Sequence, residues 1–138
     1  MDQIIKGNKR PYAYGTWENK IVVMPDGFRL IFIEEFMFPF DLEKLNNSLT
    51  KSVLDGLLKN LDRYEDAELT KDKRDCKSGT AVKIANDRAE VYVNEKFLKV
   101  YGKGVTFKIS KLDRPEIKPV LVYDELDLIG YVLPIRMK

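Results

Sequence analysis

Alternating apolar and polar positions mark the first third of the chain as β-structure. The segments KIVVM (20–24) and FRLIFIEE (28–35) are separated by Pro25, Asp26 and Gly27, residue types that are common in tight turns. The pattern therefore predicts a β-hairpin. Apolar residues stand on both faces of its second arm, which is typical of a strand that is covered on both sides.

The spacing of apolar residues changes after Pro39 to every third or fourth position, which predicts helix. The repeating positions are Leu42, Leu45, Leu49, Val53, Leu57 and Leu61. Asp41 is the expected N-cap, and the polar step at 46–48 offers a break after which Ser48 would cap a second helix. We expect one or two helices between 41 and 61.

Residues 62–80 interrupt the periodic pattern. Eleven of these nineteen residues are charged, and very few can be buried. The composition predicts a surface loop or insertion at about 62–80. Cys76 lies in this segment, and we interpret it as an exposed thiol rather than a nucleophile, because the chain has no histidine to act as its base.

Alternation resumes after Thr80 and predicts further strands. The expected strands are AVKIAN (81–86), RAEVYV (88–93), VTFKIS (105–110), PVLVYD (119–124) and LIGYVLPIRM (128–137). A short helix is expected at 94–102, capped by Asn94 and ended by Gly102. The resulting order is strand, helix, three strands. Pro134 lacks a backbone donor, so its position suits either an edge strand or the point where strand pairing ends.

Size and composition fit one domain spanning 1–138. The chain has 138 residues, of which 44% are hydrophobic, enough to fill one core. The 24 basic and 22 acidic residues nearly balance, so net charge alone implies no nucleic-acid partner. A single cysteine excludes an intrachain disulfide. No apolar run approaches the roughly 20 residues that span a bilayer, and the first residues lack the apolar core of a signal peptide. We expect a cytoplasmic protein without membrane contact.

Most catalytic constellations are missing from the sequence. Without histidine there is no Ser–His or Cys–His pair and no His-based metal site. No glycine-rich phosphate loop of the usual length is present. The acidic residues are scattered and specify no paired-carboxylate site, which leaves a carboxylate–metal nuclease as a third hypothesis. We expect a protein that is not an enzyme, with no catalytic residue, no cofactor and no metal.

Two groups of lysines have two alternative interpretations, a solvated surface or a surface that faces phosphate. The region 96–118 has seven basic residues and two acidic ones, so it is locally positive. Its candidate DNA-binding residues are Lys96, Lys99 and Lys103. The polar side of the helix predicted at 41–61 adds Lys44, Lys51 and Lys59.

The stretch 89–137 resembles the final part of the bacterial DNA polymerase III sliding clamp, the β clamp. In that family a strand enters a short helix through a Val-Asn or Phe-Asn step, and three strands follow. The last strand ends in a terminus of the type Tyr-Val-x-x-Pro-Met-Arg-Leu. This chain has Val93-Asn94 and ends in YVLPIRM at 131–137, with one added lysine.

A second segment, MPDGFRL (24–30), resembles the clamp's Thr-Asp-Gly-His-Arg-Leu segment. Phe28 stands where the family has histidine, and Pro25 where it has threonine. The resemblance implies an α+β fold, a DNA-clamp-like domain in which antiparallel sheets carry two or three helices on one side. It also implies a groove that receives short peptides from polymerases and other replication or repair proteins. The matching groove residues are Asp26, Gly27, Arg29, Leu30, Pro134, Ile135, Arg136 and Met137.

Clamps of this family are rings of six similar domains that encircle duplex DNA without reading its sequence. The resemblance implies a replication or repair accessory protein, a processivity factor that assembles around DNA, binds clamp-motif peptides, or does both. The chain has length for only one such domain. Either several copies form a homo-oligomer, or the chain is a monomeric protein-interaction module that mimics or regulates a clamp. The expected partners are duplex DNA and polymerases or other clamp-binding proteins.

Overall fold

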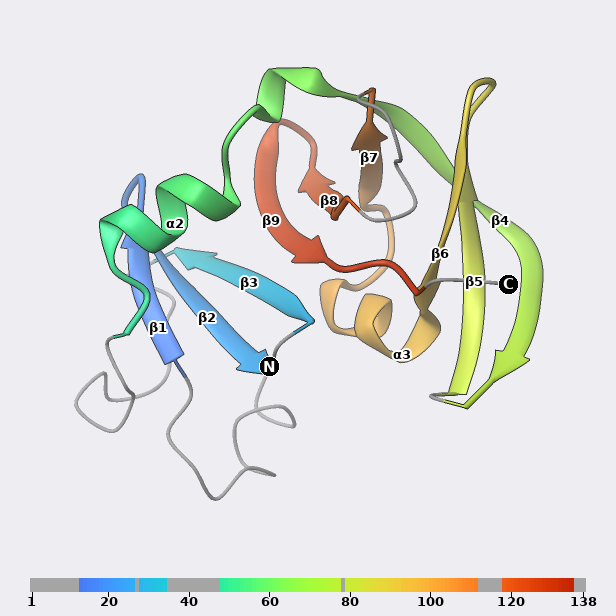
Figure 1. Cartoon of the computed structure of the whole chain (residues 1–138), viewed down its shortest axis with the longest axis horizontal. Helices are drawn as coiled ribbons and strands as arrows, with labels where there is room; N and C mark the ends of the chain where they lie inside the picture. Colours follow the sequence, from blue (N-terminus) through green and yellow to red (C-terminus); the bar gives the residue numbers. More distant parts are fainter. Residues whose placement is uncertain (1–12, 27, 35–47, 78, 112–117, 136–138) are drawn as a thin grey trace. The chain divides into compact units, whose positions relative to one another are not determined.

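The computed structural model describes residues 13–26, 28–34, 48–77, 79–111 and 118–135 (Figure 1). The chain forms two compact units, 1–59 and 60–138, and each is described by itself. Both consist of antiparallel strands with a helix, so the expected α+β class is confirmed. Two compact units are not necessarily two domains. The single clamp-like domain expected over 1–138 therefore stays a prediction.

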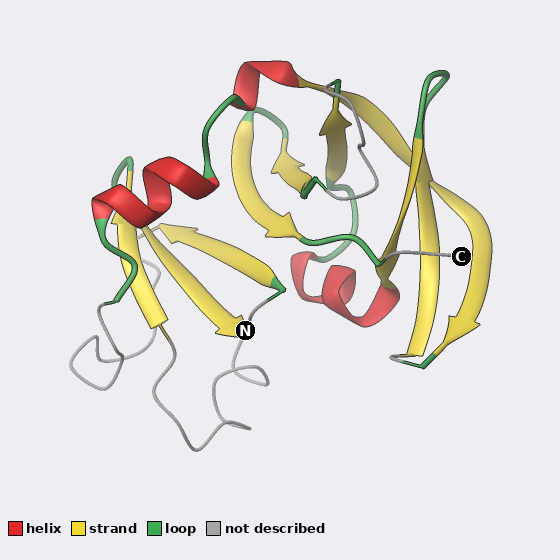
Figure 2. Ribbon diagram, viewed as in Figure 1, coloured by secondary structure: helices red, strands yellow, loops and turns green. Residues whose placement is uncertain are grey.

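The first unit contains a three-stranded antiparallel sheet (Figure 2). Its strands are β1 (Ala13–Trp17), β2 (Lys20–Asp26) and β3 (Arg29–Glu34), in that order. The hairpin expected from the sequence is the pair β2 and β3. Glu18 and Asn19 connect β1 to β2 with φ values of 46° and 68°, the left-handed conformation that two-residue hairpin turns require.

Helix α2 (Lys51–Leu57) is shorter than the helical region expected at 41–61. Asp41 and the rest of 35–47 lie outside the described residues. The predicted cap at Ser48 was wrong. Thr50 is the N-cap, and its side-chain oxygen accepts a hydrogen bond from the Val53 N–H at 3.3 Å.

The apolar face predicted for this helix was also wrong by one position. Leu54 and Leu58 are buried, whereas Val53 is 44% exposed. Leu49 is buried too, but it precedes the cap and donates its N–H to the Tyr14 carbonyl oxygen at 3.0 Å. Leu49 therefore does not belong to the helix. Counting every fourth residue from Leu49 leads to Val53, which lies on the exposed side of α2.

The second unit contains a six-stranded antiparallel sheet in the order β9-β8-β7-β4-β5-β6. Its elements are η3 (Leu61–Arg63), β4 (Tyr64–Cys76), β5 (Gly79–Ala85), β6 (Glu90–Asn94), α3 (Glu95–Leu98), η4 (Lys99–Tyr101), β7 (Thr106–Ser110), β8 (Val120–Asp124) and β9 (Asp127–Val132). All five strands predicted in the last third are present, although the last, expected at 128–137, ends at Val132. The predicted short helix is confirmed as well, with Asn94 accepting from the Lys96 N–H at 3.1 Å and Gly102 at φ 80°.

The loop predicted at about 62–80 was wrong, because most of it is strand β4. Tyr64–Ala67 pairs with β7, and Glu68–Cys76 pairs with β5. Some of the charged side chains that suggested a loop form ion pairs with β5 or with the connection between β5 and β6. Arg88 lies 2.6 Å from Glu65, and Lys83 lies 3.1 Å from Asp72. A highly charged segment can therefore form a strand, provided that its partners carry the opposite charge.

The core of the second unit lies inside its curled sheet, with α3 contributing Leu98. Its buried members are Ala67, Val82, Ile84, Val91, Val93, Leu98, Phe107, Ile109, Val120, Val122 and Val132. Pairing of β9 with β8 ends at Val132, before Pro134, which is one of the two alternatives expected from the sequence. Beyond it, Ile135 donates its N–H to the Tyr92 carbonyl oxygen at 2.7 Å. The residues that follow β9, the first strand in this order, thus bond to β6, which is the last.

Candidate functional site

The lysines predicted at 96–103 lie together on one short segment. Lys96, Lys99 and Lys103 are all exposed, on α3, on η4 and in the turn that follows. Glu95 precedes them, and its carboxylate lies 2.6 Å from the Lys73 ammonium. This ion pair lowers the pKa of Glu95. The segment therefore presents three cations to solvent, while its acidic residue is engaged by β4.

The other predicted DNA-binding lysines belong to the first unit. Lys51 is the first residue of α2, and Lys59 follows the helix; both are exposed. Asp55 is exposed on the same helix and reduces the local positive charge. Lys44 lies outside the described residues.

The residues predicted for the peptide groove are divided between the two units. Asp26 ends β2, Arg29 begins β3, and Leu30 is buried. Pro134 and Ile135 are half-buried in the second unit. The remaining predicted groove residues, Gly27, Arg136 and Met137, lie outside the described residues. The groove stays a prediction.

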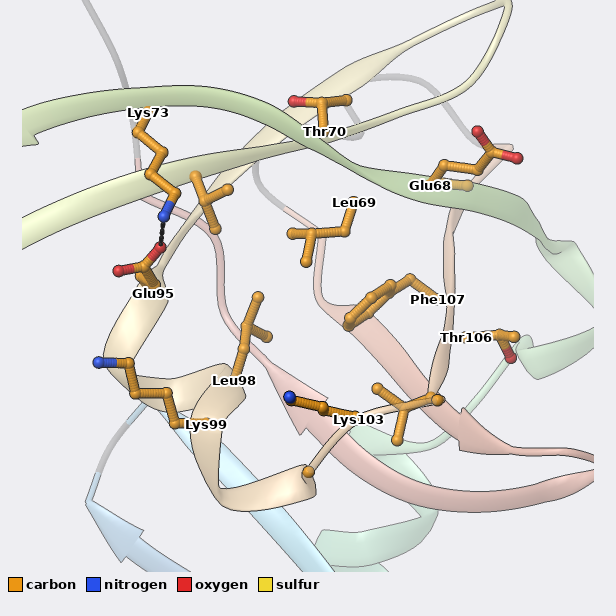
Figure 3. A pocket seen from close by; sticks show the side chains of 15 residues that line it. Glu68, Leu69, Thr70, Lys73, Glu95, Leu98, Lys99, Lys103, Thr106 and Phe107 are labelled. Carbon is orange, nitrogen blue, oxygen red and sulfur yellow. Dashed lines mark ion pairs between the residues drawn. The ribbon is translucent and has the colours of Figure 1, made fainter.

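A cavity of about 920 Å³ opens beside β4 in the second unit (Figure 3). Its apolar lining comes from Ala67, Leu69, Val82, Leu98, Val105 and Phe107. Its polar rim includes Glu68, Thr70, Lys73, Glu95, Lys99 and Lys103. The cavity thus combines an apolar interior with charged groups at its mouth, the usual character of a binding pocket.

The cavity exists because β4 changes partners beside it. β7 pairs with β4 only as far as Ala67 opposite Phe107. The chain that leads into β7 turns at Gly102 and Gly104, whose φ values of 80° and 82° suit glycine. From Glu68 onward β4 continues with β5 instead. The space between β4 and the turn at 102–105 is left open.

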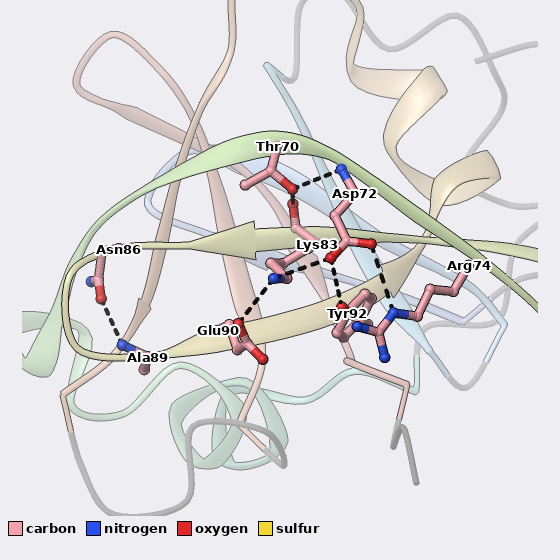
Figure 4. A network of polar contacts seen from close by, with 8 residues as sticks. All are labelled: Thr70, Asp72, Arg74, Lys83, Asn86, Ala89, Glu90 and Tyr92. Carbon is pink, nitrogen blue, oxygen red and sulfur yellow. Dashed lines mark hydrogen bonds and ion pairs between the residues drawn. The ribbon is translucent and has the colours of Figure 1, made fainter.

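The outer side of β4, β5 and β6 carries a polar network (Figure 4). Asp72 is at its centre, accepting from the Tyr92 hydroxyl at 3.1 Å and lying 3.1 Å from the Lys83 ammonium. Lys83 also lies 3.1 Å from Glu90. The Arg74 guanidinium stacks 4.9 Å from the centre of the Tyr92 ring.

A β-bulge positions this network. The β4–β5 register shifts between Leu69 and Lys73. Within the bulge, the Thr70 hydroxyl donates to the Lys83 carbonyl oxygen at 3.0 Å and accepts from the Asp72 N–H at 3.2 Å. The hydrogen bond from Lys83, followed by that from Tyr92, lowers the pKa of Asp72. Since each charge has a partner, the network is suited to holding the bulge rather than to acid–base catalysis.

Within the described ranges, no group of three or more His, Cys, Asp or Glu residues is placed to hold a metal ion. No helix in the same ranges is long and apolar enough to cross a membrane. The comparisons with known proteins add no identification. Neither a family model, nor a curated protein, nor a solved structure matches this chain.

The sequence did not point to the cavity or to the polar network. One signal for the cavity was present, because Ala67 and Leu69 are apolar residues spaced by two within the charged stretch, as in a strand with one covered face. The composition of the stretch outweighed that signal. The network depends on the register of three strands, which no local pattern encodes.

Proposed function

We propose that this chain is a clamp-like accessory protein of DNA replication or repair, which assembles around duplex DNA without reading its sequence and receives clamp-motif peptides. The observation that carries the proposal is the exposed basic segment formed by Lys96, Lys99 and Lys103. Glu95 is drawn to Lys73, so the cations of this segment are available to phosphate oxygens. Such contacts attract any duplex and carry no sequence information.

The order of the elements gives further support. β6, α3 and the strands β7, β8 and β9 follow the order of strand, helix and three strands that the resemblance associates with the last clamp domain.

The alternative is a monomeric protein-interaction module that mimics or regulates a clamp. The cavity beside β4 favours this alternative, because an apolar hollow with charged rim residues suits a protein segment better than a DNA backbone. The two functions differ in what they require. A clamp needs self-association and duplex binding, whereas a module needs neither.

The DNA-binding part is tested by titrating fluorescent duplexes of unrelated sequence with the full chain at several salt concentrations. We expect similar affinities for all duplexes, falling as salt rises. The double variant Lys96→Glu, Lys99→Glu should bind more weakly and reduce the slope of log K against log salt by about 2. Lys77→Glu is the matched control, since Lys77 is exposed outside the basic segment. An unchanged affinity in the double variant, or equal loss in the control, contradicts the proposal.

A further inference from the structure

Leu69 is an apolar side chain on the core-facing side of β4 that the fold leaves half exposed. Alternation along a strand places it on the same face as Ala67, which is 8% exposed and belongs to the core. Leu69 itself is 51% exposed. It faces the cavity, where Leu98 and Phe107 point toward it (Figure 3). An apolar surface thus stays open where a continuing sheet would cover it.

The backbone of β4 is open at the same place. β7 leaves β4 after Ala67. From Glu68 to Cys76 the only strand paired with β4 in the described part of the chain is β5, which lies along its opposite edge. An open strand edge offers N–H and C=O groups to any extended chain that can lie beside it.

The mouth of the cavity favours a negatively charged ligand. Lys73 is paired with Glu95 at 2.6 Å. Lys99, Lys103 and Glu68 are exposed at the rim, and none of them has a close ion-pair partner within the ranges that the structure describes, so the rim keeps one net positive charge. A carboxylate that approached them would bring complementary charge to a site whose interior is apolar.

We propose that this cavity binds an extended segment of a partner protein that adds as a strand to the edge of β4 at 68–73. Alternate apolar side chains of the segment pack on Leu69, Leu98 and Phe107, and an acidic side chain lies between Lys99 and Lys103. The volume of about 920 Å³ lies in the range of about 300–1,000 Å³ typical of pockets for short ligands. The proposal goes beyond the proposed function, because Leu69 has no part in DNA binding and the cavity shares no residue with the predicted groove for clamp-motif peptides.

The probes are short fluorescein-labelled peptides in which leucine or phenylalanine alternates with glutamate or threonine. Fluorescence anisotropy with the full chain should show saturable binding for acidic members of the set. Leu69→Asp should weaken that binding by about tenfold or more, equivalent to about 1.4 kcal/mol. Leu126→Asp is the matched control, because Leu126 is 95% exposed in the turn between β8 and β9. It should leave binding unchanged.

Methylation of the peptide backbone tests the strand pairing itself. Methyl groups on the amide nitrogens of one alternate set should abolish binding, while the other set should tolerate them, because only one set of a strand's amides faces a given neighbour. Equal tolerance of both sets overturns strand addition. Reversing the charge of Lys99 and Lys103 together should weaken acidic peptides and strengthen basic ones.

Two outcomes overturn the proposal as a whole. One is an absence of saturable binding across the peptide set. The other is binding of dodecanoate, used as a small anionic amphiphile, while every peptide stays inert, since that assigns the cavity to a small molecule. Lys96→Glu separates this site from the DNA surface, because Lys96 does not line the cavity. It should weaken DNA binding and leave peptide binding intact.

Discussion

The Tyr101 ring packs directly against the backbone of Gly130. A Cβ atom at residue 130 would lie 2.4 Å from ring carbons of Tyr101, with no room to fit. Tyr101 ends η4, and Gly130 lies in the middle of β9. This contact therefore sets how closely the helical segment with the exposed lysines approaches the sheet.

We expect Gly130→Ala to destabilise the protein by about 1–3 kcal/mol, because the added methyl group must displace the ring or the strand. Urea unfolding of the full chain gives the measurement. Gly56→Ala is the control, for which we expect a change in stability of the opposite sign. Nothing lies within 4 Å of a Cβ atom at Gly56 in α2, so alanine should stabilise that helix by up to about 1 kcal/mol. A loss of stability in both variants contradicts this account.

Thr50 should contribute to the stability of α2 through its side chain. Its oxygen accepts the Val53 N–H at 3.3 Å, which satisfies a donor that the helix itself leaves without a partner. Thr50→Ala should cost about 1 kcal/mol in urea unfolding. Thr50→Ser retains the hydroxyl and should cost much less. Equal losses would show that the methyl group, rather than the cap, matters.

The polar network should make stability depend on acid pH. The hydrogen bonds from Lys83 and then Tyr92 lower the pKa of Asp72 in the folded chain. Such a carboxyl group stabilises the fold above its unfolded pKa of about 3.9, and this contribution is lost as pH falls through the folded pKa. We expect the free energy of unfolding to decrease below about pH 4. In the Asp72→Asn variant, the free energy of unfolding should decrease less steeply with falling pH. An identical slope in the variant and the unaltered chain would rule out the network as the cause.

Tyr64 should make the stability of the fold decrease at alkaline pH. Burial, followed by the neighbouring Tyr131 and Tyr123, raises the pKa of Tyr64 to about 12. A tyrosine that holds its proton more tightly when folded stabilises the fold below its unfolded pKa of about 10. That contribution is lost as pH rises from about 10 toward 12. In the Tyr64→Phe variant, stability should decrease less over this pH range, as measured by thermal unfolding. An unchanged decrease in the variant would mean that other groups cause the loss of stability.

Local signals in the sequence were enough for much of the fold. Asn94 and Gly102 delimit the short helix because capping and left-handed backbone are properties of single residues. Alternation identified β5 to β9 because one face of each strand carries core residues. The end of strand pairing near Pro134 follows from one residue as well, since proline cannot donate to a ladder and β9 ends before it.

The failures share a physical cause, which is dependence on residues distant in sequence. β4 resembled a loop because the ion pair from Lys83 to Asp72 is invisible in composition. The face of α2 was misplaced because Leu49 is held by the backbone of β1 rather than by the helix. The cavity was missed because it depends on β7 leaving β4 at Ala67. Of the lysines predicted to bind DNA, Lys96, Lys99 and Lys103 lie on one segment, whereas Lys51 and Lys59 belong to the first unit. The ligand of these lysines stays a prediction.

Sedimentation velocity of the full chain over a wide concentration range, with and without duplex DNA, tests the proposed clamp-like function most directly. Under the proposed function, in which these 138 residues form one clamp-like domain, several copies are needed to enclose DNA. We expect self-association that grows with concentration and a multimeric complex on the duplex. A strict monomer at every concentration, in both the presence and the absence of DNA, would contradict the account.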